Sequence, residues 1–561
     1  MSAVVSVLST RLSNAAATAF GTPLDPELRS ATKPEFGHFQ SNLALRLANQ
    51  LGTPPRAVAA RLVEALDVDD LCEPPTIAGP GFVNLTLRSS TLAATVNERT
   101  PFAPRDETVV VDYSQPNVAK QMHVGHLRST VIGDALCNVL AYVGYRVVRQ
   151  NHVGDWGTQY GMMIEQLLEE QLNADSLDLQ GLQELYERSR RHFDSDPAFA
   201  DLSRLRVVKL QSGDPDTRAS WRRMVEVSLA DFEQVYARLG SGLQRADVVG
   251  ESAYNDDLAK IVAELLDADL LTESDGALCA FLPGFHGRDG QPLPVIVQKS
   301  DGGFGYSATD LAAIRHRVGS LKADRIVYVV DHRQALHFEM IFTLAQAAGW
   351  LPPDTSAEHV SFGTVLGPGG KPFKTRAGGT VKLTTLLDEA VERADALLAD
   401  RTGIDRSATA TAVGIGAVKY ADLSSDRGND YVFDLDRMVA MTGNTGPYLQ
   451  YAHARLTRLL TKAGEASTTV TVLDHPVEQR LALLLTGFAD TVVQVSETLQ
   501  PHRLCTYLYD VAAALSAFYE QCPVLTSAGA TRTSRIALCT ATRQVLQDGL
   551  GLLGIAAPDA M

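Results

Sequence analysis

The sequence predicts an α/β protein with a doubly wound parallel sheet, a small α/β domain before it and an all-helical domain after it. Short β-branched runs at 108–113, 145–150 and 325–330 are typical of buried parallel strands. A helical pattern over 126–144 joins the first two runs into a βαβ unit. From about residue 436 the strand signals fade, and helical stretches dominate at 448–463, 477–499 and 501–522.

The first 88 residues or so predict the small α/β domain. Residues 4–17 have a helical pattern, and 39–51 carry apolar residues at helical spacing. Residues 76–87 combine a glycine-containing turn with a strand of alternating character. A linker with Pro101 and Pro104 follows.

The rest of the central part alternates strand and helix patterns. Residues 295–297 predict a further strand, 308–318 a helix, and a last helix begins near Phe338. Together these elements predict an open, Rossmann-like parallel sheet with a long, mostly helical insertion near 165–290. We expect domains at 1–100, 105–385 and 436–561, with a connecting helical stem at 386–435.

Composition narrows the class of protein. The 561 residues are 45% apolar, as in soluble proteins of two to four domains. No stretch approaches the roughly 20 apolar residues of a membrane helix, and the N-terminus lacks the pattern of a secretory signal. The six cysteines are scattered without a C-x-x-C pair, which argues against a zinc site or a disulfide framework. We therefore expect a cytoplasmic enzyme with reduced thiols and no bound metal.

The net charge of −16 by itself favours an acidic metabolic enzyme over a protein that binds nucleic acid. A large RNA-binding enzyme can nevertheless gather its basic residues on one face. Local sequence motifs are therefore more informative about nucleic-acid binding than the total charge.

The motif His123-Val124-Gly125-His126 lies between a predicted strand and a predicted helix. Ligands of open α/β sheets bind at the carboxyl ends of strands, and a helix N-terminus favours phosphates. Two imidazoles there can hydrogen-bond the phosphates of ATP, and Gly125 lets adenosine approach the backbone. Without its neighbours, the motif is equally compatible with two structural or solvated histidines.

The neighbouring blocks make the motif specific. Read in order, they resemble the arginyl-tRNA synthetases, a class I family, along the whole chain. This resemblance implies an enzyme, usually monomeric, that activates L-arginine with Mg²⁺-ATP and transfers it to the terminal adenosine of tRNA(Arg). It also implies that activation needs the cognate tRNA. The blocks are 111–122, 127–134, 151–161, 373–383, 434–437 and 444–451.

The resemblance also implies how arginine is bound, because carboxylates suit the planar donors of a guanidinium. Tyr306 and Asp310 are four residues apart, on one face of a helix start. Asp112 ends the first strand of the sheet, where it either contacts the amino acid or faces the sheet interior. The arginine-binding residues implied are Asp112, Asn117, Tyr306, Asp310 and Gln334.

The ATP site departs from the class pattern. Class I enzymes use a lysine-rich second signature, and the corresponding stretch here, 372–376, lacks its usual second lysine. The resemblance implies that Lys120, just before the histidine motif, compensates, so Lys120, His123 and His126 are the expected catalytic residues. Lys371 directly precedes this stretch, on the same glycine-bounded loop as Lys374 and Arg376. The ATP-binding residues implied are His123, Gly125, His126, Lys374 and Arg376.

For tRNA, the resemblance implies two contact regions. Tyr448, Tyr451 and Arg455 share one helix face and match an anticodon-binding helix, where unpaired bases stack on aromatic rings. The first domain resembles one that binds the D-loop corner, with Asn84 and Phe82 as candidates.

Two other functions remain open at this point. One is a different enzyme with the histidine motif, such as a small nucleotidyltransferase, although such chains are short and lack a helical C-terminal domain. The other is a synthetase-like paralogue that binds RNA or a regulatory partner without catalysis. The intact residues of both implied substrate sites argue against the second.

Overall fold

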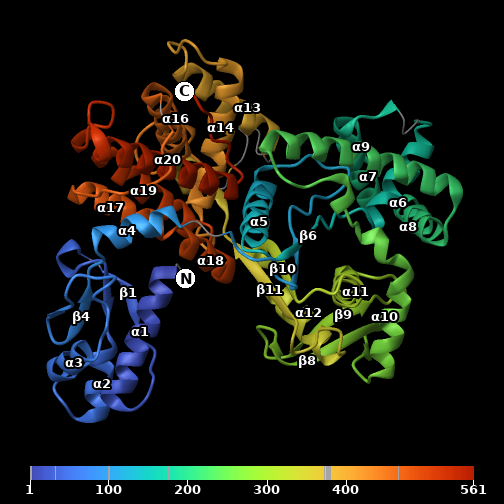
Figure 1. Ribbon diagram of the computed structural model, residues 1–561. Coiled ribbons are helices and arrows are strands. Elements are labelled where there is room, and N and C mark those ends of the chain that lie inside the picture. Colours follow the sequence, from blue (N-terminus) through green and yellow to red (C-terminus); the bar gives the residue numbers. More distant parts are fainter. Residues whose placement is uncertain are drawn as a thin grey trace.

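The computed structural model describes residues 3–31, 33–98, 101–172, 176–371, 373, 381–464 and 466–561. Figure 1 shows the central sheet between a group of insertion helices and the C-terminal helices, with the N-terminal domain below the latter. Lys374 and Arg376, predicted to bind ATP, lie outside the described residues.

The central sheet has the strand order β11-β10-β5-β6, and all three pairings are parallel. Because β6 lies on one side of β5 and β10 on the other, the winding reverses between β5 and β10. The carboxyl ends of these two strands therefore border the crevice in which such sheets bind ligands. The bounds are β5 (Thr108–Asp112), β6 (Arg146–Gln150), β10 (Arg325–Asp331) and β11 (Ser356–Phe362).

Helices cover both faces of this sheet, so the doubly wound prediction is confirmed. Val109 and Val111 of β5 pack in one hydrophobic core with α5 (Val124–Tyr142). Val110 points to the other face and packs with α11 (Tyr306–Gly319) and α12 (Ala335–Ala347). Side chains of a strand alternate between the two faces of the sheet, so the continuous apolar run of β5 contributes to two hydrophobic cores.

The insertion is helical only in its first part. Residues 272–298 form an antiparallel sheet of three strands, and the prediction that 295–297 belong to the main sheet was wrong. Val295 and Val297 are buried while Ile296 is 46% exposed, the alternation of a sheet with one covered face. The elements are α6 (Thr158–Glu169), α7 (Leu179–Ser195), α8 (Pro197–Ser212), α9 (Pro215–Leu239), α10 (Asn255–Asp267), β7 (Thr272–Ser274), β8 (Ala277–His286) and β9 (Pro292–Gln298).

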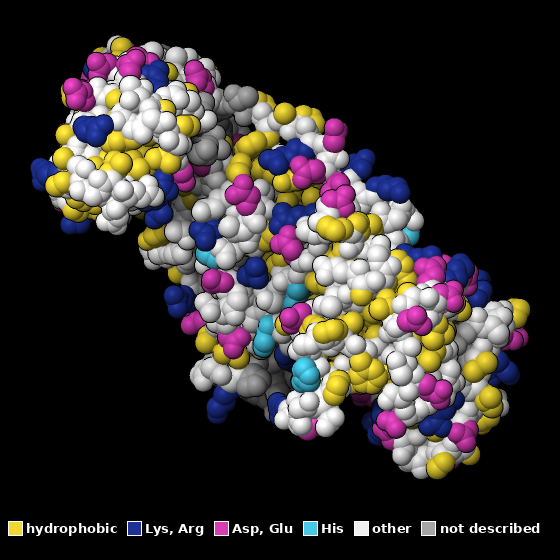
Figure 2. Space-filling model, turned by 90° about the horizontal axis from the view of Figure 1, so that it is seen from below, with side chains coloured by type: hydrophobic (Ala, Val, Ile, Leu, Met, Phe, Trp, Pro, Cys, Tyr) yellow, Lys and Arg dark blue, Asp and Glu magenta, His cyan; other side chains and the backbone are white. Residues whose placement is uncertain are grey.

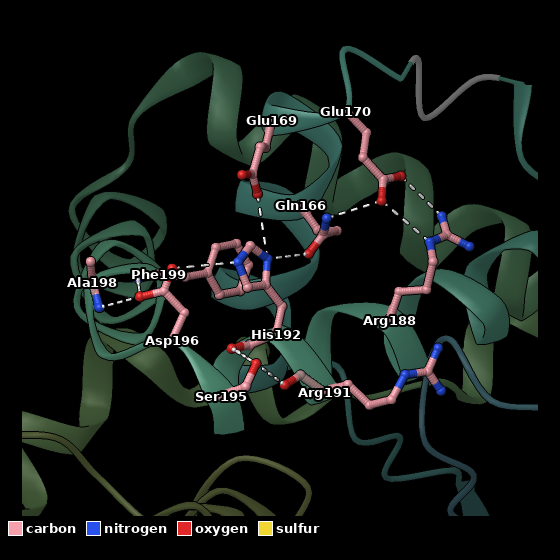
Figure 3. Close-up of polar contacts among 10 residues, drawn as sticks. All are labelled: Gln166, Glu169, Glu170, Arg188, Arg191, His192, Ser195, Asp196, Ala198 and Phe199. Carbon is pink, nitrogen blue, oxygen red and sulfur yellow. Dashed lines mark hydrogen bonds and ion pairs between the residues drawn. The ribbon is translucent and has the colours of Figure 1, made fainter.

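His192 joins three of these helices (Figure 3). Its ring, on α7, stacks on Phe199 of α8 with the centroids 3.9 Å apart. Its Nδ1 lies 3.0 Å from Gln166 Oε1 of α6, and Arg188 pairs with Glu170 at 3.1 Å. Exposed ion pairs contribute little, so the stacking and the apolar packing beneath hold the insertion together.

In its described residues, the N-terminal domain is an antiparallel sheet of order β1-β2-β4-β3 with four α-helices. The helical pattern predicted over 39–51 was wrong at its start, because Phe39 pairs with Leu85 in the sheet before α2 begins. Asn97 joins this domain to the C-terminal one by two hydrogen bonds with Val470. The elements are α1 (Ala3–Phe20), β1 (Leu28–Ser30), β2 (Phe39–Ser41), α2 (Leu43–Leu51), α3 (Pro55–Glu64), β3 (Thr76–Ala78), β4 (Phe82–Leu85) and α4 (Ser89–Asn97).

The described residues after Met438 contain helices and connecting segments only. The stretch predicted at 477–499 is two helices, separated at Gly487. Among the described residues, no helix has the length and apolar character that crossing a membrane requires. The elements after β11 are β12 (Val365–Leu366), α13 (Leu383–Leu397), α14 (Arg406–Leu423), β13 (Tyr431–Val432), α15 (Leu435–Met438), α16 (Gly446–Ala463), α17 (Pro476–Thr486), α18 (Phe488–Thr498), α19 (His502–Gln521) and α20 (Gly529–Leu552).

Candidate functional site

The candidate site lies at the carboxyl ends of β5 and β10. The segment after β5 leads to Asn117 and Lys120, and the short helix η5 (His332–Gln334) after β10 brings Gln334. Asp310, near the start of α11, is tied to α12 by a 2.7 Å contact between its Oδ2 and His337 Nε2. The structure thus places predicted residues from segments far apart in the chain at the carboxyl ends of two neighbouring parallel strands.

The segment that follows β5 has an unusual backbone. Three of its non-glycine residues have positive φ, a conformation that costs on the order of 1–3 kcal/mol each unless the surroundings enforce it. Side chains from α5, from the 151–161 block and from α9 accept hydrogen bonds from the three N–H groups. These bonds are Ser114 N to Ser129 Oγ (2.8 Å), Gln115 N to Asn151 Oδ1 (3.0 Å) and Ala119 N to Ser228 Oγ (2.9 Å).

Asn117 is exposed at the crevice and is positioned by the 151–161 block. The N–H of Val118 donates to the carbonyl of Gly154 at 3.1 Å, and the N–H of Gly154 donates to the carbonyl of Pro116 at 3.1 Å. A Cβ on Gly154 would collide with Asn117 Oδ1. Glycine at 154 therefore leaves the space that the Asn117 side chain occupies.

The two motif histidines cap α5 reciprocally. His123 is the N-cap, and its Nδ1 accepts the N–H of Gly125 at 3.0 Å. His126 Nδ1 accepts the N–H of His123 at 3.1 Å. Since each Nδ1 is an acceptor, the proton of each neutral ring is on Nε2, which leaves two Nε2–H donors. A Cβ on Gly125 would lie 2.7 Å from the His123 ring, so this glycine makes room for a histidine of the protein itself.

Electrostatics keeps both rings neutral. Burial lowers the pKa of His123, and the positive charge of Lys120 lowers it further. Burial, followed by the effect of His123, lowers the pKa of His126 to about 3. Near pH 7 the pair therefore presents neutral donors beside the helix N-terminus, an arrangement that binds phosphate oxygens.

Lys120 lies near this pair, but its ammonium rests on the insertion. Its Nζ is 4.6 Å from the centre of the Tyr186 ring on α7. The chain that follows the second signature stretch returns to the same place, because Val124 N–H donates to Val381 O at 3.2 Å and Leu383 N–H donates to Met122 O at 3.0 Å. Lys120, the histidines and this stretch thus share one end of α5.

An acidic group forms the other half of the site. Glu251, in the short helix η4 (Glu251–Tyr254), is buried, and burial raises its pKa to about 8 with further contributions from the charges of Asp155 and Asp310. Asp155 positions η4, because it accepts hydrogen bonds from Ser252 N at 2.9 Å and Ser252 Oγ at 2.6 Å. Tyr306 and Glu251 line the same cavity, which places these two side chains near each other. Glu251 and Asp310 can therefore accept hydrogen bonds from a cationic ligand, and Tyr306 can orient it.

Sequence reasoning missed Glu251. It lies in a mixed polar stretch, 245–257, whose charges carry no spacing that separates one carboxylate from the others. Only the fold shows that this one is buried beside Asp310. A cavity of about 610 Å³ adjoins it, between the insertion helices and α11, with Trp156, Tyr186, Glu251 and Tyr306 among its lining residues.

The prediction that Asp112 contacts the bound amino acid was wrong. Its carboxylate is 2% exposed and accepts hydrogen bonds from Arg317 Nη2 at 2.6 Å and from His152 N at 3.3 Å. Arg317 is fully buried and also donates to Gln150 Oε1 at 2.5 Å. Asp112 therefore faces the interior, the other orientation that its position allowed, and anchors α11 to the sheet.

The predicted RNA-contact residues differ in accessibility. On α16, Tyr451 is 36% exposed, and the Arg455 guanidinium lies 3.5 Å from the centre of the Tyr519 ring, an aromatic group that the sequence did not single out. Tyr448 is half-buried, with its hydroxyl 3.2 Å from Ser516 Oγ. Asn84 is 3% exposed and accepts a hydrogen bond from Gln40 Nε2 at 2.8 Å. The prediction of Asn84 as a surface contact was therefore wrong.

The surface charge is mixed where it can be seen. Figure 2 shows basic and acidic side chains interspersed over the face seen from below, without a large area of one sign. The net charge of −16 is therefore not concentrated on that face.

Three family models match the chain. The model described as "tRNA synthetases class I (R), catalytic domain" matches residues 89–435. "DALR anticodon binding domain" matches 449–561, and "Arginyl tRNA synthetase N terminal domain" matches 6–87. The matches therefore extend over nearly the whole sequence.

Individual proteins agree with these models. The arginine–tRNA ligase of Cutibacterium acnes is 54% identical, covering 99% of this chain and 100% of its own. That of Thermobifida fusca is 49% identical, covering 99% of both. The solved arginyl-tRNA synthetases of Plasmodium falciparum and Thermus thermophilus superpose with TM-scores of 0.85 and 0.83 at 28% and 26% identity; they cover 100% and 99% of this chain and 100% of their own.

Proposed function

Because the chain belongs to the class I arginyl-tRNA synthetases, we propose that its crevice performs the two steps of arginine–tRNA ligation with the residues described above. The observation that carries this assignment of roles is the meeting of an acidic pocket with a neutral histidine pair at the switch point of the sheet. Glu251 and Tyr306 line the acidic pocket, and Asp310 follows Tyr306 by one turn of α11, where its charge acts on Glu251. His123 and His126 form the histidine pair.

In the first step the carboxylate of arginine attacks the α-phosphorus of ATP, which enters as its Mg²⁺ complex. A carboxylate–phosphorus bond forms, the bond to the bridging oxygen breaks, and pyrophosphate leaves. The two Nε2–H donors and the N-terminus of α5 bind phosphate oxygens on which negative charge increases. Asn117 and Gln334, exposed at the ends of β5 and β10, bind the α-amino and carboxylate end of arginine.

Selectivity for arginine follows from the acidic pocket. A guanidinium presents five N–H donors in a plane, and the carboxylates of Asp310 and Glu251 accept them from two sides. The ammonium of lysine is a compact charge that leaves part of these acceptors unpaired in a buried pocket, and such a site discriminates strongly. Tyr306, 74% exposed without substrate, closes the pocket over the side chain.

Lys120 supplies the cation that the second signature stretch lacks. Its ammonium leaves the Tyr186 ring and turns to the phosphates, while Lys374 and Arg376 contribute from the loop itself. A cation–π contact of about 0.5–2 kcal/mol is weak enough to be exchanged for a phosphate contact.

In the second step a hydroxyl of the terminal tRNA ribose attacks the carbonyl of arginyl-adenylate, and AMP leaves. Tyr451, Arg455 and Tyr519, with the half-buried Tyr448, form the surface on which anticodon bases stack. We assign this role to residues 436–561, the D-loop corner to 1–100, catalysis to 105–385 and the stem to 386–435. The enzyme acts as a monomer in the cytoplasm.

Arginine affinity should rise with pH because of Glu251. Its pKa is about 8 in the free site, so below pH 8 the carboxyl must lose a proton before it pairs with the guanidinium. We expect the Kd for arginine to fall by up to about tenfold per pH unit between pH 6 and 8 and to level off above, as measured by calorimetry. Glu251→Gln should bind weakly with a flat profile. A Kd that rises over this range would contradict the assignment.

ATP–pyrophosphate exchange tests the function as a whole. We expect arginine-dependent exchange in the presence of tRNA(Arg) and none without it. Absence of exchange under both conditions would refute the enzyme assignment. Exchange supported by another amino acid in place of arginine would refute the specificity.

A further inference from the structure

Two hydroxyl groups of α9 reach the segment that follows β5. Tyr236 and Ser228 are both buried, and they are eight residues apart on one face of the helix, about 12 Å along its axis. The Tyr236 hydroxyl lies 2.8 Å from Ser114 Oγ. Ser228 Oγ accepts the N–H of Ala119 at 2.9 Å. One helix of the insertion therefore contacts both ends of the site segment, residues 114–119.

The Tyr236 hydroxyl joins two side chains that hold this segment. Asn151 Nδ2 donates to it at 2.9 Å, and in this orientation Asn151 Oδ1 accepts the N–H of Gln115. The proton of the Tyr236 hydroxyl is then free for Ser114 Oγ, which also lies 2.9 Å from Thr130 Oγ1 of α5. One phenolic oxygen thus holds the Ser114 side chain and orients the amide that bonds to Gln115.

The carboxyl end of α9 is itself fixed to two other helices. Lys419 of α14 is 1% exposed, and its Nζ donates to the carbonyl of Leu239 at 2.8 Å. Asp134 of α5 accepts the N–H of Gly242, three residues beyond the last residue of α9, at 2.7 Å. Helix α9 is therefore held by α5 and α14, which makes it a fixed support for the site segment.

Stability alone is a poor explanation for the Tyr236 hydroxyl. The ring belongs to an apolar core in which phenylalanine would fill the same space, and the desolvation of a buried hydroxyl offsets much of what its hydrogen bonds contribute. The backbone that it helps to hold is strained, because non-glycine residues keep a positive φ only when their surroundings enforce it. The φ angles are 74° at Ser114, 51° at Gln115 and 63° at Ala119.

We propose that Tyr236 and Ser228 are positioning residues for arginine, which hold the site segment in the conformation that presents Asn117 to the ligand. Asn117 lies between the two ends that α9 contacts. When either hydroxyl is removed, the segment relaxes toward negative φ and the Asn117 side chain moves with it. The inference rests on the proposed function in that Asn117 binds the α-amino and carboxylate end of arginine. Tyr236 and Ser228 act only through this segment.

Tyr236→Phe tests this, because it removes the hydroxyl and keeps the ring. We expect the Kd for arginine, measured by calorimetry, to rise about tenfold, the factor that corresponds to the contribution of one hydrogen bond. The matched control is Tyr420→Phe in the stem helix α14. The buried Tyr420 hydroxyl lies 2.6 Å from Asn444 Oδ1 and 3.0 Å from the carbonyl of Cys505. This control should lower the Tm by a similar amount without changing the Kd for arginine.

A double-mutant cycle with Asn117→Ala separates positioning from a general loss of structure. If Tyr236 acts through Asn117, Tyr236→Phe should change the Kd for arginine less than twofold in the Asn117→Ala background. A loss of the same factor in both backgrounds would overturn the proposal. A Kd within twofold of the wild type in Tyr236→Phe alone would overturn it as well.

Ser228→Ala provides the same cycle if Tyr236→Phe does not fold, because Ser228 contacts the other end of the site segment. An Asn117→Ala variant that binds arginine like the wild type would refute the role of Asn117 in the proposed function, and the positioning role with it. Weakened binding in Asn117→Ala, together with wild-type binding in Tyr236→Phe and Ser228→Ala, would refute the positioning role alone.

Discussion

Asp310→Asn should reduce kcat/KM for arginine by a factor between roughly 100 and several thousand. The substitution keeps the shape of the side chain and removes the charge that pairs with the guanidinium. Loss of one partner from a buried charge pair costs about 3–5 kcal/mol, and each 1.4 kcal/mol is a factor of about ten. The measurement is steady-state charging of tRNA(Arg) over a range of arginine concentrations. The KM for ATP should stay within twofold, because the histidine pair is untouched.

A matched control for Asp310 lies at the opposite end of the sheet. Asp324 accepts the N–H of Thr108 at 2.7 Å, where β5 begins rather than ends. Asp324→Asn should change kcat/KM for arginine less than twofold while lowering stability modestly. Equal losses in the two variants would show that Asp310 acts through the fold and not through the ligand.

The sequence predicted those parts of the fold that depend on local pattern. The βαβ unit was recognisable because the β-branched runs and the helix between them are contiguous in sequence. The histidine motif indicated where the helix begins after the first strand. The separate sheet at β7–β9 was missed, because an apolar run of three residues has the same local appearance in either sheet. Its alternation of buried and exposed side chains becomes informative only when both neighbouring strands are known.

Candidate site residues could be proposed from the sequence where a motif places them on one helix or one loop, as with His123, His126, Tyr306 and Asp310. Asp112 was misassigned because a strand-end carboxylate can face either way, and its partner Arg317 is 205 residues further along the chain. Glu251 was missed for the same physical reason, since its environment is assembled entirely from distant segments.

Lys120→Ala should lower kcat for charging by about 10²–10³-fold, the usual cost of removing one group that stabilises developing charge. With the loop lysine missing, Lys120 supplies a positive charge beside the histidine pair, and this charge contributes to the lowered pKa values of both rings. The KM for arginine should change little, since Lys120 belongs to the phosphate half of the site. Single-turnover formation of arginyl-tRNA measures the effect without interference from product release.

Lys371→Ala is the natural comparison, because Lys371 is an exposed lysine directly before the second signature stretch. We expect it to lower kcat less than tenfold. Near-normal kcat in Lys120→Ala together with a large loss in Lys371→Ala would transfer the compensating role to the loop. Tyr186→Leu tests whether the contact between Tyr186 and Lys120 takes part in catalysis. If the ring only holds the ammonium between turnovers, the substitution leaves kcat unchanged. A fall in kcat that matches that of Lys120→Ala would mean that Tyr186 positions the lysine for catalysis.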